Sequence, residues 1–213
     1  MTMKRAQLGM TTLEIMVTLA IAGVFASMAV LNMDVVKRRQ AERNALREMS
    51  VLANQARSMA RTSQFPVRLS VATNPAGRTT IRWEQLPCDN ADRWGRSCPA
   101  QECYTNACGQ GNCKCIDQGE AINVPPTLNV AALHGLCWLG QGGVPRFKAD
   151  SNSPTCQSEG PPPPQPLQIL QRSNINQPFR VDHVLEVNAL TGRPRMVDCT
   201  SASAQASNPA CPR

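Results

Sequence analysis

The chain has 213 residues, of which 42% are hydrophobic, so it can form one domain with appendages. It has 22 Lys and Arg residues and 15 Asp and Glu residues, which gives a formal net charge of +7. This modest positive charge is too dispersed along the chain to indicate a nucleic-acid-binding protein by itself. All ten cysteines lie beyond Asp34, which favours a domain that matures in an oxidising compartment over a cytosolic one.

A nearly uncharged apolar run covers residues 10–33 and follows a short basic leader, residues 1–9. Glu14 is the only ionisable side chain in the run. At about 1.5 Å per residue, a helix of this length would cross a hydrocarbon layer of roughly 30 Å, so we expect a transmembrane helix over residues 10–33. The basic residues just after the run would favour a cytoplasmic C-terminal part, whereas the cysteines favour the opposite orientation.

The position of the leader differs from that in a secretory signal peptide, where the cleavage site follows the apolar core. Here the plausible site, Gly9 before Met10, precedes it. Glycine at the last leader position, a hydrophobic first mature residue and Glu14 as the fifth mature residue resemble the class III leader of type IV prepilins and pseudopilins. A plain membrane anchor with an incidental glutamate is the alternative interpretation.

This resemblance implies a processing pathway. A membrane prepilin peptidase would cleave between Gly9 and Met10 and methylate the new amine of Met10. The carboxylate of Glu14 would then face the N-terminal amine of a neighbouring subunit, so that two opposite charges are buried together.

Residues 34–63 continue the helical pattern without glycine or proline, but they are more polar. Apolar residues recur at spacings of three and four, which predicts one stripe on an amphipathic helix. The stripe consists of Ala45, Leu46, Met49, Leu52, Ala53, Ala56, Met59 and Ala60. We therefore expect one helix from about Met10 to about Ser63, with its second half packed on the ectodomain.

The end of this helix resembles H-type pseudopilins and FimT/FimU-type minor pilins, which carry Ala-Arg-x-x-Ala before an alternating strand. Ala56, Arg57 and Ala60 occupy that pattern. Alternation predicts a hairpin from residues 66–71 and 79–86, and further strands at residues 167–171, 179–187 and 195–197. The expected fold class is α+β, a type IV pilin fold in which the long N-terminal helix packs on a small antiparallel β-sheet. Residues 64–213 would form this ectodomain.

A cysteine-rich insert covers residues 88–115. Its six thiols could in principle hold zinc or an iron–sulfur cluster, but their spacing lacks the paired C-x2-C groups of such sites, and we expect a disulfide-rich insert without metal or cofactor. Cys113 and Cys115 are too close to bond each other comfortably and should have different partners. The pairing is otherwise open for the ten cysteines Cys88, Cys98, Cys103, Cys108, Cys113, Cys115, Cys137, Cys156, Cys199 and Cys211.

A loop over residues 141–166 ends in a proline-rich segment, residues 160–166. Beyond it, a serine- and alanine-rich tail contains the last two cysteines, Cys199 and Cys211. A bond between them would resemble the disulfide-bound C-terminal loop of type IV pilins.

Catalytic motifs are absent from the sequence: it has no nucleophile elbow, phosphate loop or dinucleotide fingerprint. His134 and His183 have no neighbouring ligand set, and His183 is expected to face solvent from a strand. We therefore expect no enzyme activity. Gly192, Arg193 and Arg195 resemble the Gly-Arg-x-Arg motif that is associated with DNA capture in FimT-like pilins, but Gly-Arg also occurs in relatives that do not bind DNA, where the glycine makes the turn.

The expected function is that of a minor pilin, which primes assembly and sits near the filament tip in adhesion and twitching motility. The resemblance implies as partners other minor pilins, the major pilin, the prepilin peptidase, the inner-membrane assembly platform and a tip adhesin. The chain would lie in the bacterial inner membrane, with its C-terminal domain in the periplasm, and later in the surface pilus. Alternatives are an H-type pseudopilin of a type II secretion system, a DNA-uptake pilin, and a membrane-anchored secreted binding protein or enzyme.

Overall fold

The computed structural model describes residues 11–88, 103, 106–139, 146–148, 166–188 and 190–211. It comprises two compact units, Met1–Ala41 and Glu42–Arg213, and each is described by itself. The cleavage residues Gly9 and Met10, the cysteines Cys98 and Cys156 and all of the proline-rich segment 160–166 except its last residue lie outside the described residues. The side chains of residues 25–32, 146–148, 204 and 207 also lie outside them.

The first element is helix α1 (Thr12–Ser63), which agrees with the expected helix over the described residues. Thr11 precedes its first turn and accepts a hydrogen bond at 3.3 Å from the backbone N–H of Glu14, as an N-cap threonine does. At the other end, Gln64 takes the left-handed φ of 61°, and its N–H donates to the Ala60 carbonyl at 3.1 Å. This closes the last turn, and Pro66 follows too soon for the helix to continue.

Sheet A is antiparallel and is built on the predicted hairpin. Strand β1 (Val67–Thr73) pairs with β2 (Thr79–Gln85), and the turn between them places Gly77 at a φ of 74°. Four short strands complete this sheet in the described part of the chain: β3 (Asp117–Gln118), β4 (Ile122–Val124), β6 (Cys137–Leu139) and β7 (Arg146–Lys148). The order is β3-β2-β1-β6-β7, and β4 also pairs with β2.

Sheet B is a second antiparallel sheet, with the order β10-β9-β8-β5. Strands β8 (Leu167–Gln171), β9 (Arg180–Val187) and β10 (Pro194–Asp198) correspond to the three later strands predicted from alternation. The short strand β5 (Leu128–Asn129) joins β8 at the opposite edge and precedes a 3₁₀ turn, η2 (Ala131–Leu133). A short helix, α2 (Ala202–Ser207), follows β10 in the tail.

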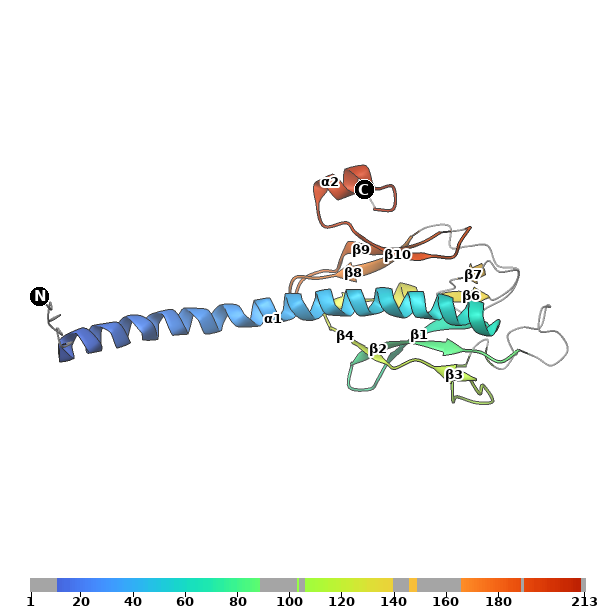
Figure 1. Ribbon diagram of the computed structural model, residues 1–213, viewed down its shortest axis with the longest axis horizontal. Coiled ribbons are helices and arrows are strands. Elements are labelled where there is room, and N and C mark those ends of the chain that lie inside the picture. Colours follow the sequence, from blue (N-terminus) through green and yellow to red (C-terminus); the bar gives the residue numbers. More distant parts are fainter. Residues whose placement is uncertain are drawn as a thin grey trace, which may run out of the picture. The chain divides into compact units, whose positions relative to one another are not determined.

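The predicted apolar stripe of α1 forms the centre of the ectodomain core. Ala53, Ala56 and Ala60 are fully buried, and the small side chains allow both sheets to approach the helix closely. In the second unit, β1 and β2 lie on one side of this part of α1 and β8 to β10 on the other (Figure 1). The structure is therefore α+β, with a helix packed on antiparallel sheets; the single small sheet expected from the sequence is two sheets.

Candidate functional site

The first unit presents Glu14 on an apolar helix surface. Every side chain described between residues 11 and 24 is exposed, including Leu13 at 72%, Met16 at 73% and Leu19 at 67%. Within the side chains that the structure describes, which leave out residues 25–32, no helix is long and apolar enough to cross a membrane. The transmembrane helix expected over residues 10–33 is therefore not found in this part of the chain.

The cysteine-rich segment contains two interlaced disulfides in its described part. Cys103 bonds Cys113, and Cys108 bonds Cys115, so the neighbouring cysteines 113 and 115 do have different partners. Cys88 and Cys137 are also disulfide-bonded. In the tail, Cys199 bonds Cys211, which is the pairing suggested by the resemblance to pilins.

A buried ion pair holds the disulfide-bonded loops on sheet A. Arg68 on β1 is 1% exposed and Glu84 on β2 is fully buried; their side chains meet at 2.8 Å. The Arg68 guanidinium also donates to the carbonyl oxygens of Cys103 and Asn106, each at 2.6 Å. One side chain thus links the sheet to the loop at two points, which compensates for the cost of burying its charge.

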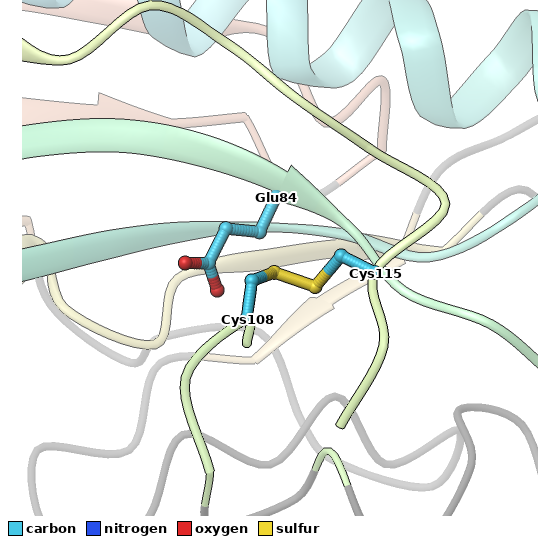
Figure 2. Close-up of side chains that lie close together, drawn as sticks. All are labelled: Glu84, Cys108 and Cys115. Atoms are coloured by element: carbon cyan, nitrogen blue, oxygen red, sulfur yellow. A yellow bond between two sulfur atoms is a disulfide. The ribbon is translucent and has the colours of Figure 1, made fainter. Parts of the chain in front are cut away.

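The same carboxylate lies beside a disulfide (Figure 2). Ligand atoms of Glu84, Cys108 and Cys115 lie within 4.8 Å of one another, close enough for a metal site. The two sulfurs, however, are bonded to each other and are therefore not thiolates, which are the form of cysteine that binds metal. Glu84 is also paired with Arg82 at 3.1 Å in addition to Arg68. In this oxidised state the cluster is structural.

The hairpin between β9 and β10 carries the predicted motif residues and is firmly docked. Asn188 accepts three hydrogen bonds at its side-chain oxygen from Leu190 and Thr191, which fixes the turn. Gly192 has a φ of 65°, and its carbonyl oxygen accepts a hydrogen bond at 2.8 Å from the buried indole N–H of Trp138. The turn requires a glycine here because side chains rarely adopt this backbone conformation.

Four arginines are distributed around this hairpin. Arg193 and Arg195 are exposed. Arg57 of α1 donates its Nε–H to the Thr191 carbonyl at 3.1 Å, so helix and turn are directly linked. Burial and the positive charges of Arg61 and Arg193 lower the pKa of Arg57 from its ordinary value. Within the described residues neither Arg193 nor Arg195 forms an ion pair.

A groove of about 760 Å³ lies between α1 and this hairpin. Its walls include Ser50 and Asn54 of α1 and the residues from Arg193 to Met196 on the other side. The predicted DNA-contact residues Arg193 and Arg195 therefore lie at a concave surface. Glu186 of β9, which lies opposite Arg195 in the strand register, also lines the groove, and its carboxylate moderates the positive charge there.

Both histidines lie within the fold. His134 accepts a hydrogen bond at Nδ1 from the Val71 N–H at 3.0 Å, and burial together with the charge of Arg68 lowers its pKa, against an opposing effect of Glu84. Burial also lowers the pKa of His183, although the negative charges of Asp198, Asp182 and Glu42 act in the opposite direction. The His183 side chain is only 14% exposed, so the expectation that it faces solvent is wrong.

Several contacts were not predicted from the sequence. Glu42 is buried on α1, where its carboxylate accepts hydrogen bonds from Thr127 and Gln171. The Arg68–Glu84 pair and the contact between Arg57 and Thr191 were also missed. The alternation on β1 and β2 places Arg68 and Glu84 at opposed positions, which is the one signal that could have indicated their pairing.

Comparisons of the chain with protein-family models, curated proteins and solved structures found no match. The function must therefore be inferred from the sequence and the geometry.

Proposed function

We propose that this chain is a minor pilin of a type IV pilus, a non-enzymatic subunit that helps to prime filament assembly and forms part of the tip complex. The observation that carries the proposal is the N-terminal part of α1. It has exposed apolar side chains, and Glu14, its one acidic residue before Asp34, lies in the first helical turn.

These apolar side chains point in every direction around the helix axis. The residues are Leu13, Ile15, Met16, Val17, Leu19, Ile21 and Val24, each at least 45% exposed. A helix that is apolar all round is stable only when other apolar groups cover it, and the equivalent helices of neighbouring subunits would do so in a filament. The carboxylate of Glu14 would then be buried opposite the amine of Met10 on a neighbour, which offsets the cost of burying either charge alone.

The ectodomain supports the proposal at a coarser level. Its helix-on-sheet arrangement is compatible with a type IV pilin fold, and the disulfides of residues 103–115 are what a disulfide-rich insert would need. The Cys199–Cys211 bond closes a C-terminal loop like that of pilins. Disulfides persist in oxidising compartments, so we place the ectodomain in the bacterial periplasm before assembly and on the cell surface afterwards.

In this proposal the apolar half of α1 holds the chain at the inner membrane until assembly. The partners are the prepilin peptidase, which cleaves after Gly9 and methylates Met10, then the assembly platform, the other minor pilins, the major pilin and a tip adhesin.

Two related functions would use the same N-terminal features: that of an H-type pseudopilin of a type II secretion system and that of a DNA-uptake pilin. The cationic groove at Arg193 and Arg195 is the observation that favours the second.

A deletion strain of the source bacterium, complemented with variants, tests the proposal. Deletion should reduce surface piliation and twitching motility. Glu14→Val should fail to restore them because the N-terminal amine loses its partner, whereas Glu48→Val, the same change at an exposed position of the ectodomain helix, should restore them. Full restoration by Glu14→Val would contradict the charge-pairing role. Normal pili with lost secretion would instead indicate the pseudopilin, and normal pili with lost DNA uptake would indicate the DNA-uptake pilin.

A further inference from the structure

Strand β10 lies at one end of sheet B as it is formed by the described residues. The sheet order is β10-β9-β8-β5, and among the described residues β10 pairs with β9 alone. An edge strand presents unpaired N–H and C=O groups that can accept a further strand. Proteins usually protect such edges, and here Pro194 removes one donor at the start of the strand.

The hydrogen-bond pattern shows which backbone groups face this edge. Cys199 donates to Asp182 at 2.8 Å, and Asn188 donates to Arg193 at 3.0 Å, so the odd-numbered residues of this segment bond to β9. In an antiparallel ladder the alternate residues point the other way. The backbone groups of Met196 and Asp198 and the carbonyl of Pro194 therefore face outward.

The groove described above borders the first half of β10, from Pro194 to Met196. Pro194 and Met196 line it from the strand, Ser50 and Asn54 line it from α1, and Arg193 and Arg195 add positive charge at the turn end. Arg57 lies next to the same turn through its bond to Thr191. The groove thus combines outward-facing backbone groups, the apolar side chains of Pro194 and Met196, and cations without ion-pair partners among the described residues.

We propose that this groove binds an extended acidic segment of a partner protein, which adds to sheet B as a strand beside β10. The backbone of the segment would pair with Met196 and Asp198, and its carboxylates would pair with Arg193 and Arg195. A nucleic acid is the other occupant that the test considers; its phosphates would use the arginines alone and leave the outward-facing backbone groups of Met196 and Asp198 unpaired. The inference does not depend on the filament function: in a pilus the partner would be another subunit, and outside one it would be a different protein.

The test measures binding of a capped, fluorescent peptide that alternates Glu and Val to the purified full chain in detergent micelles. A matched peptide with N-methyl groups on all of its backbone amides has the same charges but has no backbone N–H on either edge to donate to β10. A third probe, oligothymidylate, represents nucleic acid. The acidic peptide should bind, its N-methylated form should bind at least about tenfold more weakly, and hydrogen exchange should slow at the Met196 and Asp198 amides.

Charge reversal on the protein provides the second arm. Arg193→Glu and Arg195→Glu should each weaken peptide binding by about tenfold or more, whereas Arg78→Glu, the same reversal on the exposed turn of sheet A, should leave it unchanged. Circular dichroism of each variant checks that it is folded. Equal binding of the two peptides, absence of peptide binding, or binding of oligothymidylate without protection of the Met196 amide would each overturn the proposal.

Discussion

Replacing Arg68 by methionine should strongly destabilise the ectodomain. The guanidinium is almost completely buried, pairs with Glu84 at 2.8 Å and donates to the carbonyl oxygens of Cys103 and Asn106. Removing one partner of a buried ion pair costs about 3–5 kcal/mol, and each carbonyl left without a donor costs about 1–3 kcal/mol, although these costs do not add fully. We therefore expect a loss of about 4 kcal/mol or more from a total stability of roughly 5–15 kcal/mol.

Urea denaturation followed by tryptophan fluorescence measures this loss, because Trp83 and Trp138 are both buried in the core. Arg82→Met is the matched control: Arg82 also pairs with Glu84, but its side chain is 31% exposed, so the loss should be about 1 kcal/mol or less. Adding Glu84→Gln to Arg68→Met should recover part of the stability by removing a buried charge that would then have only the partly exposed Arg82 as its partner. The reasoning fails if Arg68→Met costs no more than Arg82→Met.

Three further predictions follow from other contacts. His134 accepts its hydrogen bond at an unprotonated Nδ1, and its pKa in the folded chain lies below the ordinary value of 6.5. As the pH falls through 6.5, the unfolded chain therefore takes up more protons at this residue than the folded chain does. The free energy of unfolding should decrease in this range and level off once the pH is below the pKa of the folded chain. His134→Asn, which keeps an acceptor but does not titrate, should flatten this part of the stability profile measured by urea denaturation. Replacing Cys199 and Cys211 by serine should lower the free energy of unfolding by about 2–3 kcal/mol, and added reductant should no longer affect the tail. Gly192→Ala should cost about 1–2 kcal/mol because of the positive φ, and a calorimetric melting curve unchanged from that of the parent would refute it.

The elements with strong periodicity could be predicted from sequence. The apolar stripe of α1 and the five longer strands follow from local spacing, which depends only on neighbouring residues. The short strands β3 to β7 could not, because segments of two or three residues carry no periodicity and pair only when distant parts of the chain have folded. The division into two sheets was missed for the same reason.

In the candidate site, too, local sequence signals could be predicted and long-range contacts could not. The motif at Arg193 and Arg195 was visible in the sequence, but its approach to Arg57, more than a hundred residues away, depends on the docking of the hairpin by Trp138 and Thr191. His183 was placed on the correct strand and given the wrong environment, because alternation does not show that both faces of sheet B are covered. One face packs on α1 and the other on the disulfide-closed tail.

The N-terminus of the protein isolated from its own cells tests the central claim most directly. Surface filaments sheared from the source bacterium can be digested and examined by mass spectrometry. The account predicts a peptide that begins at Met10 with a methylated amine, recovered from the filament fraction. A chain in that fraction that still carries Gly9, or the absence of the protein from filaments while it is present in the cells, would contradict the account.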